Sequence, residues 1–295
     1  MRYTVATSTT LGECLAHLFA EASGRTRKQM LAGGRVRVNG AVTRLPATAL
    51  AAGDVVEVGA KRSTGAALPA GLTIVHEDRD VLVVDKPAGL LTIATERERR
   101  RTAYAHLMTY LKARRPPGRV FIVHRLDRLS SGLLVFAASP AAKQALQAQF
   151  HAHGTERTYL AVVEGTLARD EGTIRSRLVD DEPGRVHETR DPERGRVAVT
   201  HWRAVKRGAR HTLLEVRLET GRRNQIRVQL AGIGHPIAGD RVYGATSDPF
   251  GRLALHAHVL GFDHPHSGER MRFVSAAPAA FSRLGALHLP SPNSR

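Results

Sequence analysis

The chain has little cysteine, few aromatic residues and few acids. Its single cysteine, Cys14, excludes an internal disulfide and any metal site that needs several thiolates. No stretch approaches the roughly 20 consecutive apolar residues that cross a bilayer. The first 15 residues, "MRYTVATSTTLGECL", lack the charged-then-apolar layout of a secretory signal. We therefore expect a cytoplasmic protein that is not associated with a membrane.

Basic residues are abundant instead. Lys and Arg number 44 against 27 Asp and Glu, a formal net charge of +17. Such an excess costs self-repulsion unless a polyanion is a regular partner, and the planar fork of arginine suits phosphate. Nucleic acid is the favoured partner. The alternatives are a generally arginine-rich proteome, or a membrane-surface protein, for which no basic amphipathic helix stands out.

Residues 1–60 are expected to form a small unit. Apolar residues recur at helical spacing over 11–22, and a second short helix is expected from an N-cap at Thr26 to the glycine pair at 33–34. The strand "RVRV" then meets Asn39-Gly40, a pair typical of a two-residue hairpin turn. Basic residues gather near one edge and are expected to contact phosphate, although a solvated basic surface is the alternative: Arg25, Arg27, Lys28, Arg35 and Arg37.

The stretch from residue 9 to residue 58, with its "GRVRVNG" hairpin, resembles the S4 RNA-binding domain. The resemblance implies a small α/β domain that grips structured RNA. Residues 61–71, "KRSTGAALPAG", have the composition of a linker. A second, larger domain is expected over 72–290.

The second domain is predicted to be α+β. Many short β-rich runs alternate with few helices, one of them over residues 102–115, which favours a mainly antiparallel, mixed sheet over a βαβ series. Residues 180–196 are rich in polar and turn-forming residues and are expected to form an exposed loop. Trp202 lies in a strand-like run and is expected in the core.

Asp127 stands in "VHRLDRLSSGL", between two strand-like runs. Judged alone, an aspartate there is more often a turn cap or a salt-bridge partner than a reagent. The run "RRNQIRVQLAGIG" is consistent with an amphipathic helix that turns Ile226, Leu230 and Ile233 inward and places Arg223 and Arg227 on another face. Arg227 can then meet a buried carboxylate and keep it ionised, as a nucleophile or base requires.

Five motifs in order carry a more specific resemblance: "DKPAGLLT" (85–92), "HRLDRLSSGLLVFA" (124–137), "RTYLAVVEG" (157–165), "GRRNQIRVQLAGIGHPIAGDRVYG" (221–244) and "LHAHVLGFDHP" (255–265). Over residues 72–276 the chain resembles the RluA family of RNA pseudouridine synthases, several members of which carry an S4 domain. The resemblance implies isomerisation of uridine in structured RNA, large-subunit ribosomal RNA rather than tRNA. No cofactor or metal is needed, and a monomer is expected.

By that resemblance Asp127 is the catalytic aspartate, which attacks the ribose C1′ or helps to form a glycal-type intermediate. Tyr159 matches the tyrosine that packs against the target base, and Arg227 the arginine that pairs with the catalytic acid. Arg125 matches an arginine that fills the space left by the extracted uridine. The remaining residues expected to contact RNA in this domain are His124, Arg128 and Arg223.

The chain departs from the family pattern at two places. Arg223-Asn224 stands where Thr-His is common, and Leu129-Ser130 where an acid and threonine are usual, which bears on RNA-target identity more than on the reaction. The main alternative is an inactive S4-bearing RNA-binding or assembly factor, which loss of a catalytic residue would favour. A DNA-binding protein lacks a recognisable motif. The pairs "HAH" and "HPH" complete no recognised metal set.

Overall fold

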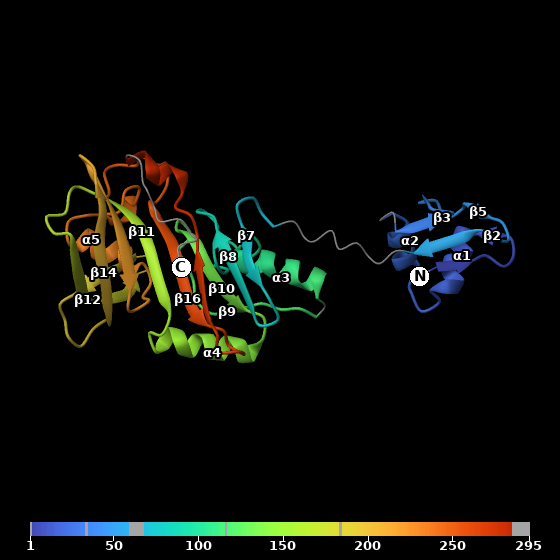
Figure 1. Ribbon diagram of the computed structural model, residues 1–295, viewed down its shortest axis with the longest axis horizontal. Coiled ribbons are helices and arrows are strands. Elements are labelled where there is room, and N and C mark those ends of the chain that lie inside the picture. Colours follow the sequence, from blue (N-terminus) through green and yellow to red (C-terminus); the bar gives the residue numbers. More distant parts are fainter. Residues whose placement is uncertain (1, 33–34, 59–67, 116, 183–184, 285–295) are drawn as a thin grey trace. The chain divides into compact units, whose positions relative to one another are not determined.

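The computed structural model describes residues 2–32, 35–58, 68–115, 117–182 and 185–284. The chain divides into two compact units, Met1–Ala66 and Ala67–Arg295, each with its own core (Figure 1). Most of the expected linker, residues 61–67, and the glycine pair at 33–34 lie outside the described residues. Among the helices of the described part, none is long and apolar enough to cross a membrane.

The first unit packs two helices against a small sheet. The helices are α1 (Leu11–Leu18) and α2 (Gly24–Ala32). Four antiparallel strands lie in the order β1 (Arg2–Thr4), β6 (Val55–Val58), β3 (Val36–Val38), β4 (Ala41–Val42), and β2 (Thr9–Thr10) pairs separately with β5 (Ala49–Leu50). Apolar side chains from both helices and from the strands form one buried cluster.

The ends of both helices differ from the prediction. Thr10 and Glu13 form a reciprocal capping box, so α1 begins at Leu11, but it ends at Leu18 rather than at residue 22. Helix α2 begins at Gly24, ahead of Thr26. The backbone N–H of Thr26 donates to the Ser23 hydroxyl at 3.2 Å, so Ser23, and not Thr26, serves this end of the helix.

The predicted hairpin turn is confirmed. Asn39 (φ 48°) and Gly40 (φ 82°) both have left-handed backbone conformations between β3 and β4. A two-residue turn with positive φ at both positions matches the twist of the flanking strands, and Asn-Gly adopts it most readily.

The second unit is built on one eleven-stranded sheet (Figure 1). Its main path runs β13-β12-β14-β15-β11-β16-β10-β8-β7, with β17 beside β16 and β9 beside β10. The strands are β7 (Thr73–Glu77), β8 (Val81–Lys86), β9 (Phe121–Ile122), β10 (Ser131–Ala137), β11 (Glu156–Glu164), β12 (Glu171–Glu182), β13 (Arg185–Thr189), β14 (Arg196–Arg207), β15 (His211–Leu218), β16 (Leu255–Asp263) and β17 (Arg270–Val274). The pairing of β10 with β16 is parallel and the others are antiparallel, which confirms the predicted α+β class.

Helices cover both faces of the central strands. The helices are α3 (Ala103–Arg114), α4 (Pro140–His151) and α5 (Gln225–Gly232). On β8, Leu82 and Val84 join the cluster that contains Leu107 of α3. Their neighbours on the strand turn to the opposite face, into the cluster that contains Leu146 of α4. Strands buried on both faces explain why these runs are continuously apolar.

The segment 180–196, which was predicted to be an exposed loop, contains part of a β-hairpin. Much of the segment 180–196 extends β12 and forms β13, which pair as an antiparallel hairpin. Val186 is buried and packs with Val228 of α5, whereas most of its neighbours are polar because they face solvent. A single apolar side chain gave too little alternation to indicate a strand. Trp202, at 8% exposed, lies in the core as predicted.

Gly132 lies where β10 approaches the backbone of β16 closely. Its φ is +109°, and a Cβ there would lie 2.6 Å from the Ala257 nitrogen and inside contact distance of the Ala257 carbonyl oxygen. We expect Gly132→Ala to cost more than about 3 kcal/mol of unfolding free energy, because strain and a backbone clash combine. Gly268→Ala is the matched control, with φ +73° and open space around it, and should cost about 1–2 kcal/mol. Urea unfolding measures both, and equal losses would contradict the clash.

Candidate active site

A cavity of about 460 Å³ opens beside Asp127 in the second unit. Its walls are residues 122–127, the end of α4 with the turn that follows it, Arg157 and Tyr159 of β11, and the segment from Leu218 to Arg223. A small adjoining hollow of about 60 Å³ is lined by Asp127, Tyr159 and Arg227, among others. The structure therefore brings together the three residues predicted to carry the chemistry.

The turn that bears Asp127 is held by the segment "DKPAGLLT". Lys86 is completely buried, and its ammonium donates to the carbonyl oxygens of Ser130 (2.7 Å), Leu90 (2.8 Å) and Pro87 (3.0 Å). Burial lowers the pKa of Lys86 to about 7, against the opposing charge of Asp127. One cation thus ties the loop after β8 to the end of the Asp127 turn.

Further hydrogen bonds hold the same two segments together. The Thr92 hydroxyl donates to the Leu126 carbonyl at 2.7 Å and lies 3.2 Å from the Leu126 nitrogen. The Gly89 N–H donates to the Arg128 carbonyl at 2.8 Å, and Arg128 Nε donates back to the Gly89 carbonyl at 3.2 Å. Main-chain atoms on both sides of Asp127 are therefore fixed.

Arg227 is divided between two carboxylates. Its Nη1 lies 3.6 Å from Asp127 Oδ2, whereas Nε and Nη2 donate to Asp240 at 2.7 and 2.8 Å. Burial by itself lowers the pKa of Arg227, but hydrogen bonds and charge from Asp240 outweigh it and raise the pKa. The predicted proximity to Asp127 is present, and the closer partner is Asp240, which lies in "GIGHPIAGD" with no regular spacing to indicate it.

Asn224 and Tyr243 complete the surroundings of Arg227. The Asn224 Oδ1 accepts from Arg227 Nη1 at 3.0 Å, and its Nδ2 donates to the Tyr243 hydroxyl at 3.0 Å. The guanidinium carbon lies 4.9 Å from the centroid of the Tyr243 ring. The sequence flagged Asn224 only as a departure from the family pattern, and this network gives the side chain a positioning contact.

The helix that carries Arg227 is shorter than predicted. It begins at Gln225, because Asn224 is left-handed (φ 51°), so Arg223 is outside it and does not share a helix face with Arg227. Arg223 instead donates to Asp180 of β12 at 2.6 Å. Ile226 and Leu230 are buried as predicted, but Ile233 follows the last helical residue and is 40% exposed.

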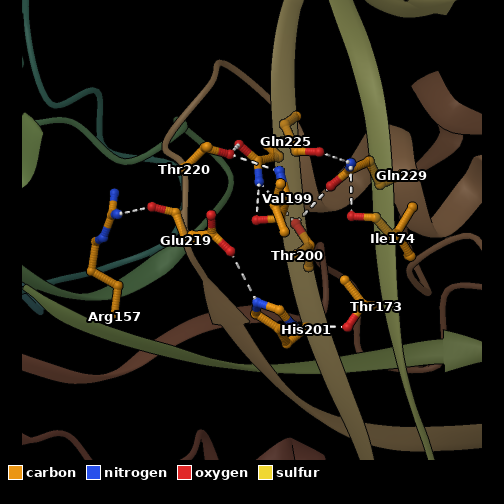
Figure 2. Close-up of polar contacts among 11 residues, drawn as sticks. Arg157, Thr173, Ile174, Val199, Thr200, His201, Glu219, Thr220, Gln225 and Gln229 are labelled. Carbon is orange, nitrogen blue, oxygen red and sulfur yellow. Dashed lines mark hydrogen bonds and ion pairs between the residues drawn. The ribbon is translucent and has the colours of Figure 1, made fainter. Parts of the chain in front are cut away.

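A buried amide and hydroxyl network anchors α5 to β14 (Figure 2). Gln225 Nε2 donates to the Thr200 hydroxyl at 2.9 Å, and Thr200 donates to Gln229 Oε1 at 2.6 Å. Thr220 in turn donates to Gln225 Oε1 at 2.8 Å. Since buried polar groups are costly unless every one is bonded, this network fixes the helix in a single position.

Tyr159 is nearly buried, at 9% exposed. Burial raises the pKa of its hydroxyl to about 12, with the charge of Arg157 opposing and that of Asp127 adding to the shift. The pairing of β11 with β16 shifts register between Thr158 and Tyr159. The extra residue, His258, lies on β16, so β11 keeps its regular alternation, as its unshifted pairing with β15 shows. The phenol is therefore neutral and directed by the strand.

The residues expected to contact RNA lie in different environments. Arg125 is exposed and lines the cavity. Arg128 is also exposed, but its Nε is occupied by the Gly89 carbonyl. His124 stacks on Phe150 with a centroid distance of 4.5 Å and accepts the Val135 N–H at 3.2 Å. Burial, with a smaller effect from Arg157, lowers the pKa of His124 to about 3, so the ring is neutral.

In the first unit the expected contact residues also divide. Arg25, Lys28 and Arg37 are exposed, and Arg35 is half-buried. The Arg27 Nη1 donates to the main-chain carbonyls of residues 22 and 19, at 2.5 and 3.2 Å. Arg27 therefore stabilises the turn between the two helices, a local function that the clustering of charge did not indicate.

The histidine pairs have hydrogen-bonding partners of their own. His256 Nδ1 lies 2.9 Å from the Ser131 hydroxyl, and His258 Nδ1 lies 2.6 Å from the Ser275 carbonyl. His264 is 3.3 Å from Asp78. In the described part of the chain, no three His, Cys, Asp or Glu side chains are grouped so that they could hold a metal ion.

The sequence is similar to known pseudouridine synthases. It is 40% identical to the "Uncharacterized RNA pseudouridine synthase YlyB" of Bacillus subtilis over 73% of this chain and 72% of that protein. It is 35% identical to "Ribosomal large subunit pseudouridine synthase D" of Pseudomonas aeruginosa over 94% and 91%, and 34% identical to the protein of that name in Vibrio cholerae over 91% and 87%.

The fold is similar to solved structures. "Human RNA Pseudouridylate Synthase Domain Containing 4" aligns with a TM-score of 0.60 at 22% identity, over 72% of this chain and 90% of that one. "Human RNA Pseudouridylate Synthase Domain Containing 1" aligns with a TM-score of 0.57 at 26% identity, over 72% and 86%. The family model described as "RNA pseudouridylate synthase" matches residues 80–232. The chain belongs to the RNA pseudouridylate synthase family.

Proposed function

We propose that the chain isomerises uridine to pseudouridine in large-subunit ribosomal RNA, with Asp127 as the catalytic carboxylate. The observation that carries the proposal is the position of Asp127: its side chain, 20% exposed, lies on a cavity wall, 3.6 Å from a buried guanidinium. The choice of RNA rests on the names of relatives that match most of the chain, which are ribosomal large-subunit synthases.

The reaction moves uracil from one atom to another without losing it. The N1–C1′ bond breaks, the base turns, and C5 bonds to C1′; the proton on C5 leaves and N1 gains one. In this proposal Asp127 either attacks C1′ or accepts the 2′ proton. The target uridine must first leave its stack, which costs a few kcal/mol. Arg125, which is exposed and lines the cavity, is proposed to offset that cost by filling the space that the uridine leaves.

Arg227 and Tyr159 are proposed to prepare the site. Arg227 places a positive charge 3.6 Å from Asp127 and restricts its rotamers, while Asp240 fixes the guanidinium itself. The neutral Tyr159 offers a ring face for the base and a hydroxyl within the same hollow. These groups are held in place before the substrate binds. The proposed reaction depends more on the correct placement of the reacting groups than on a strong acid.

The first unit is proposed to be an S4-like RNA-binding domain. Its two-helix and hairpin order, with Arg25 and Lys28 exposed on α2 and Arg37 exposed on β3, supports a phosphate-binding surface. Arg27 contributes through the fold of the turn rather than by phosphate contact.

Replacing the catalytic carboxylate by its amide tests the main proposal. We expect Asp127→Asn to abolish pseudouridine formation, because an amide neither attacks C1′ nor accepts the proton, while the RNA dissociation constant changes less than about threefold. Single-turnover assays and filter binding measure the two effects. The control is Asp263→Asn, which removes a half-exposed carboxylate from a surface ion pair with Arg270. Normal turnover in the Asp127 variant would refute the proposal.

Asp240→Asn tests the support of Arg227. The amide keeps one acceptor and loses the charge, so Arg227 is no longer held by two hydrogen bonds. We expect the single-turnover rate to fall about 10- to 100-fold and unfolding free energy to fall by about 3 kcal/mol, as for a buried pair that loses one partner. A variant that loses stability but keeps the wild-type rate at low temperature would show that Arg227 needs no such support.

The RNA surface of the first unit is tested in the full-length protein. We expect the double variant Arg25→Gln and Lys28→Gln to weaken RNA binding and to reduce the slope of log affinity against log salt by about 1–2. The slope falls because a protein with fewer phosphate contacts releases fewer counterions from the RNA when it binds. Arg79→Gln, an exposed arginine of the second unit, is the comparison. If the double variant has the same salt slope as the wild type, this surface does not contact the RNA.

A further inference from the structure

Arg157 is a buried arginine that has no acidic partner within the described part of the chain. It is 8% exposed, as deeply buried as Arg227 at 7%. Arg227 has two carboxylates within 4 Å, whereas Arg157 forms no ion pair with any described residue. An unpaired buried cation is strongly destabilising, and burial lowers the pKa of Arg157 while the neighbouring Tyr159 opposes the shift.

The hydrogen bonds of Arg157 are also incomplete. A guanidinium has five N–H donors. Nη2 donates to the Glu219 carbonyl at 2.9 Å (Figure 2), but Nε is buried with no partner, and Nη1 has no hydrogen-bond acceptor among the described residues. Buried donors are rarely left unsatisfied in folded proteins, so this site calls for a functional explanation.

The surroundings hold this guanidinium at the cavity wall. It lies over the Phe150 ring, 5.4 Å from its centroid, and Phe150 stacks in turn on His124 of the Asp127 loop. On its other side is Gly221, where a Cβ would lie only 2.7 Å from Arg157 Nη1. The absence of a side chain at Gly221 thus leaves room for the guanidinium, and the Phe150 ring packs against it.

Its position relative to the chemistry follows from the strand. Arg157 and Tyr159 are two residues apart on β11, so their side chains leave the same face, about 6–7 Å apart along the chain. Both line the cavity that Asp127 lines. A base that packs against Tyr159 therefore places its edge near Arg157.

The proposed reaction creates a charge that this cation suits. When the N1–C1′ bond breaks, its electron pair stays with the base, and the resulting uracil anion spreads negative charge onto its two carbonyl oxygens. The charge disappears when C5 bonds to C1′; the C5 proton is then lost and N1 gains a proton, so the product is neutral. A fixed donor that meets charge only as it develops accelerates such a step most.

We propose that Arg157 is a catalytic residue that donates from Nη1 to a carbonyl oxygen of the extruded uracil and stabilises the detached base. The proposal rests on the proposed function. It differs from a phosphate contact, which would strengthen RNA binding without affecting bond cleavage.

The test uses full-length protein and an unmodified in vitro transcript of large-subunit ribosomal RNA. We expect Arg157→Met to lower the single-turnover rate of pseudouridine formation about 100-fold, with an RNA dissociation constant within about threefold of wild type. Arg157→Lys, which keeps the charge, should recover at least tenfold of that loss. The matched control, Arg272→Met, removes a half-exposed arginine that pairs with Glu156 next to Arg157, and should leave both quantities unchanged.

A second substrate separates base stabilisation from a structural function. In a transcript that contains 5-fluorouridine, the electron-withdrawing fluorine stabilises the detached base, so Arg157→Met should slow loss of the N-glycoside less than it does for uridine. Gly221→Ala, which presses a methyl group on Nη1, should reproduce part of the defect without removing the charge.

The outcomes are distinct. Equal losses in the Met and Lys variants, an equal defect on both transcripts, or a loss confined to affinity and its salt slope would each overturn the proposal; the last would identify a phosphate contact. Wild-type protein that forms no pseudouridine in the transcript would instead contradict the proposed function. Full activity of Arg157→Met, with an active wild type, would overturn the catalytic function of Arg157 and leave the proposed function of the chain intact.

Discussion

The site depends on how one buried guanidinium is shared. Arg227 makes two short hydrogen bonds to Asp240 and a longer ion pair to Asp127. If Asp127 held the arginine as tightly, its carboxylate would be fully occupied by that partner. Because Asp240 takes the strong bonds, Asp127 retains a nearby positive charge and a partly exposed oxygen. Asp127 therefore has a cationic neighbour and an oxygen that is not taken up by a short hydrogen bond to it.

That arrangement requires three segments that are far apart in sequence to keep fixed positions relative to one another. The loop after β8 holds the Asp127 turn through Lys86 and Thr92, and the buried amide network holds α5 against β14. Both rely on satisfied polar groups inside the protein, whose geometry is more exacting than apolar packing. Polar contacts between elements, rather than any single strand, therefore place the carboxylate beside its arginine.

Charge serves two separate purposes in this chain. Exposed arginines such as Arg125 and Arg25 suit a polyanion, whereas the half-buried Arg27 donates to carbonyls and the buried Arg227 pairs with acids. The amino-acid composition does not distinguish these two groups of arginines. The excess of basic residues indicated nucleic acid correctly as a class of partner, yet gave no means of telling which arginine contacts solvent and which supports the fold.

Motifs and turn residues are local, so they predicted the α+β class, the Asn39-Gly40 hairpin and the family, and they pointed to Asp127, Tyr159 and Arg227 as candidate reactive residues. The folded chain was needed to show that Asp240 is the closer partner of Arg227, that residues 180–196 contain part of a β-hairpin and that α5 begins at Gln225. It was also needed to place Arg157 at the cavity with no acidic partner among the described residues. Each depends on contacts between residues distant in sequence, to which no periodicity along the chain corresponds.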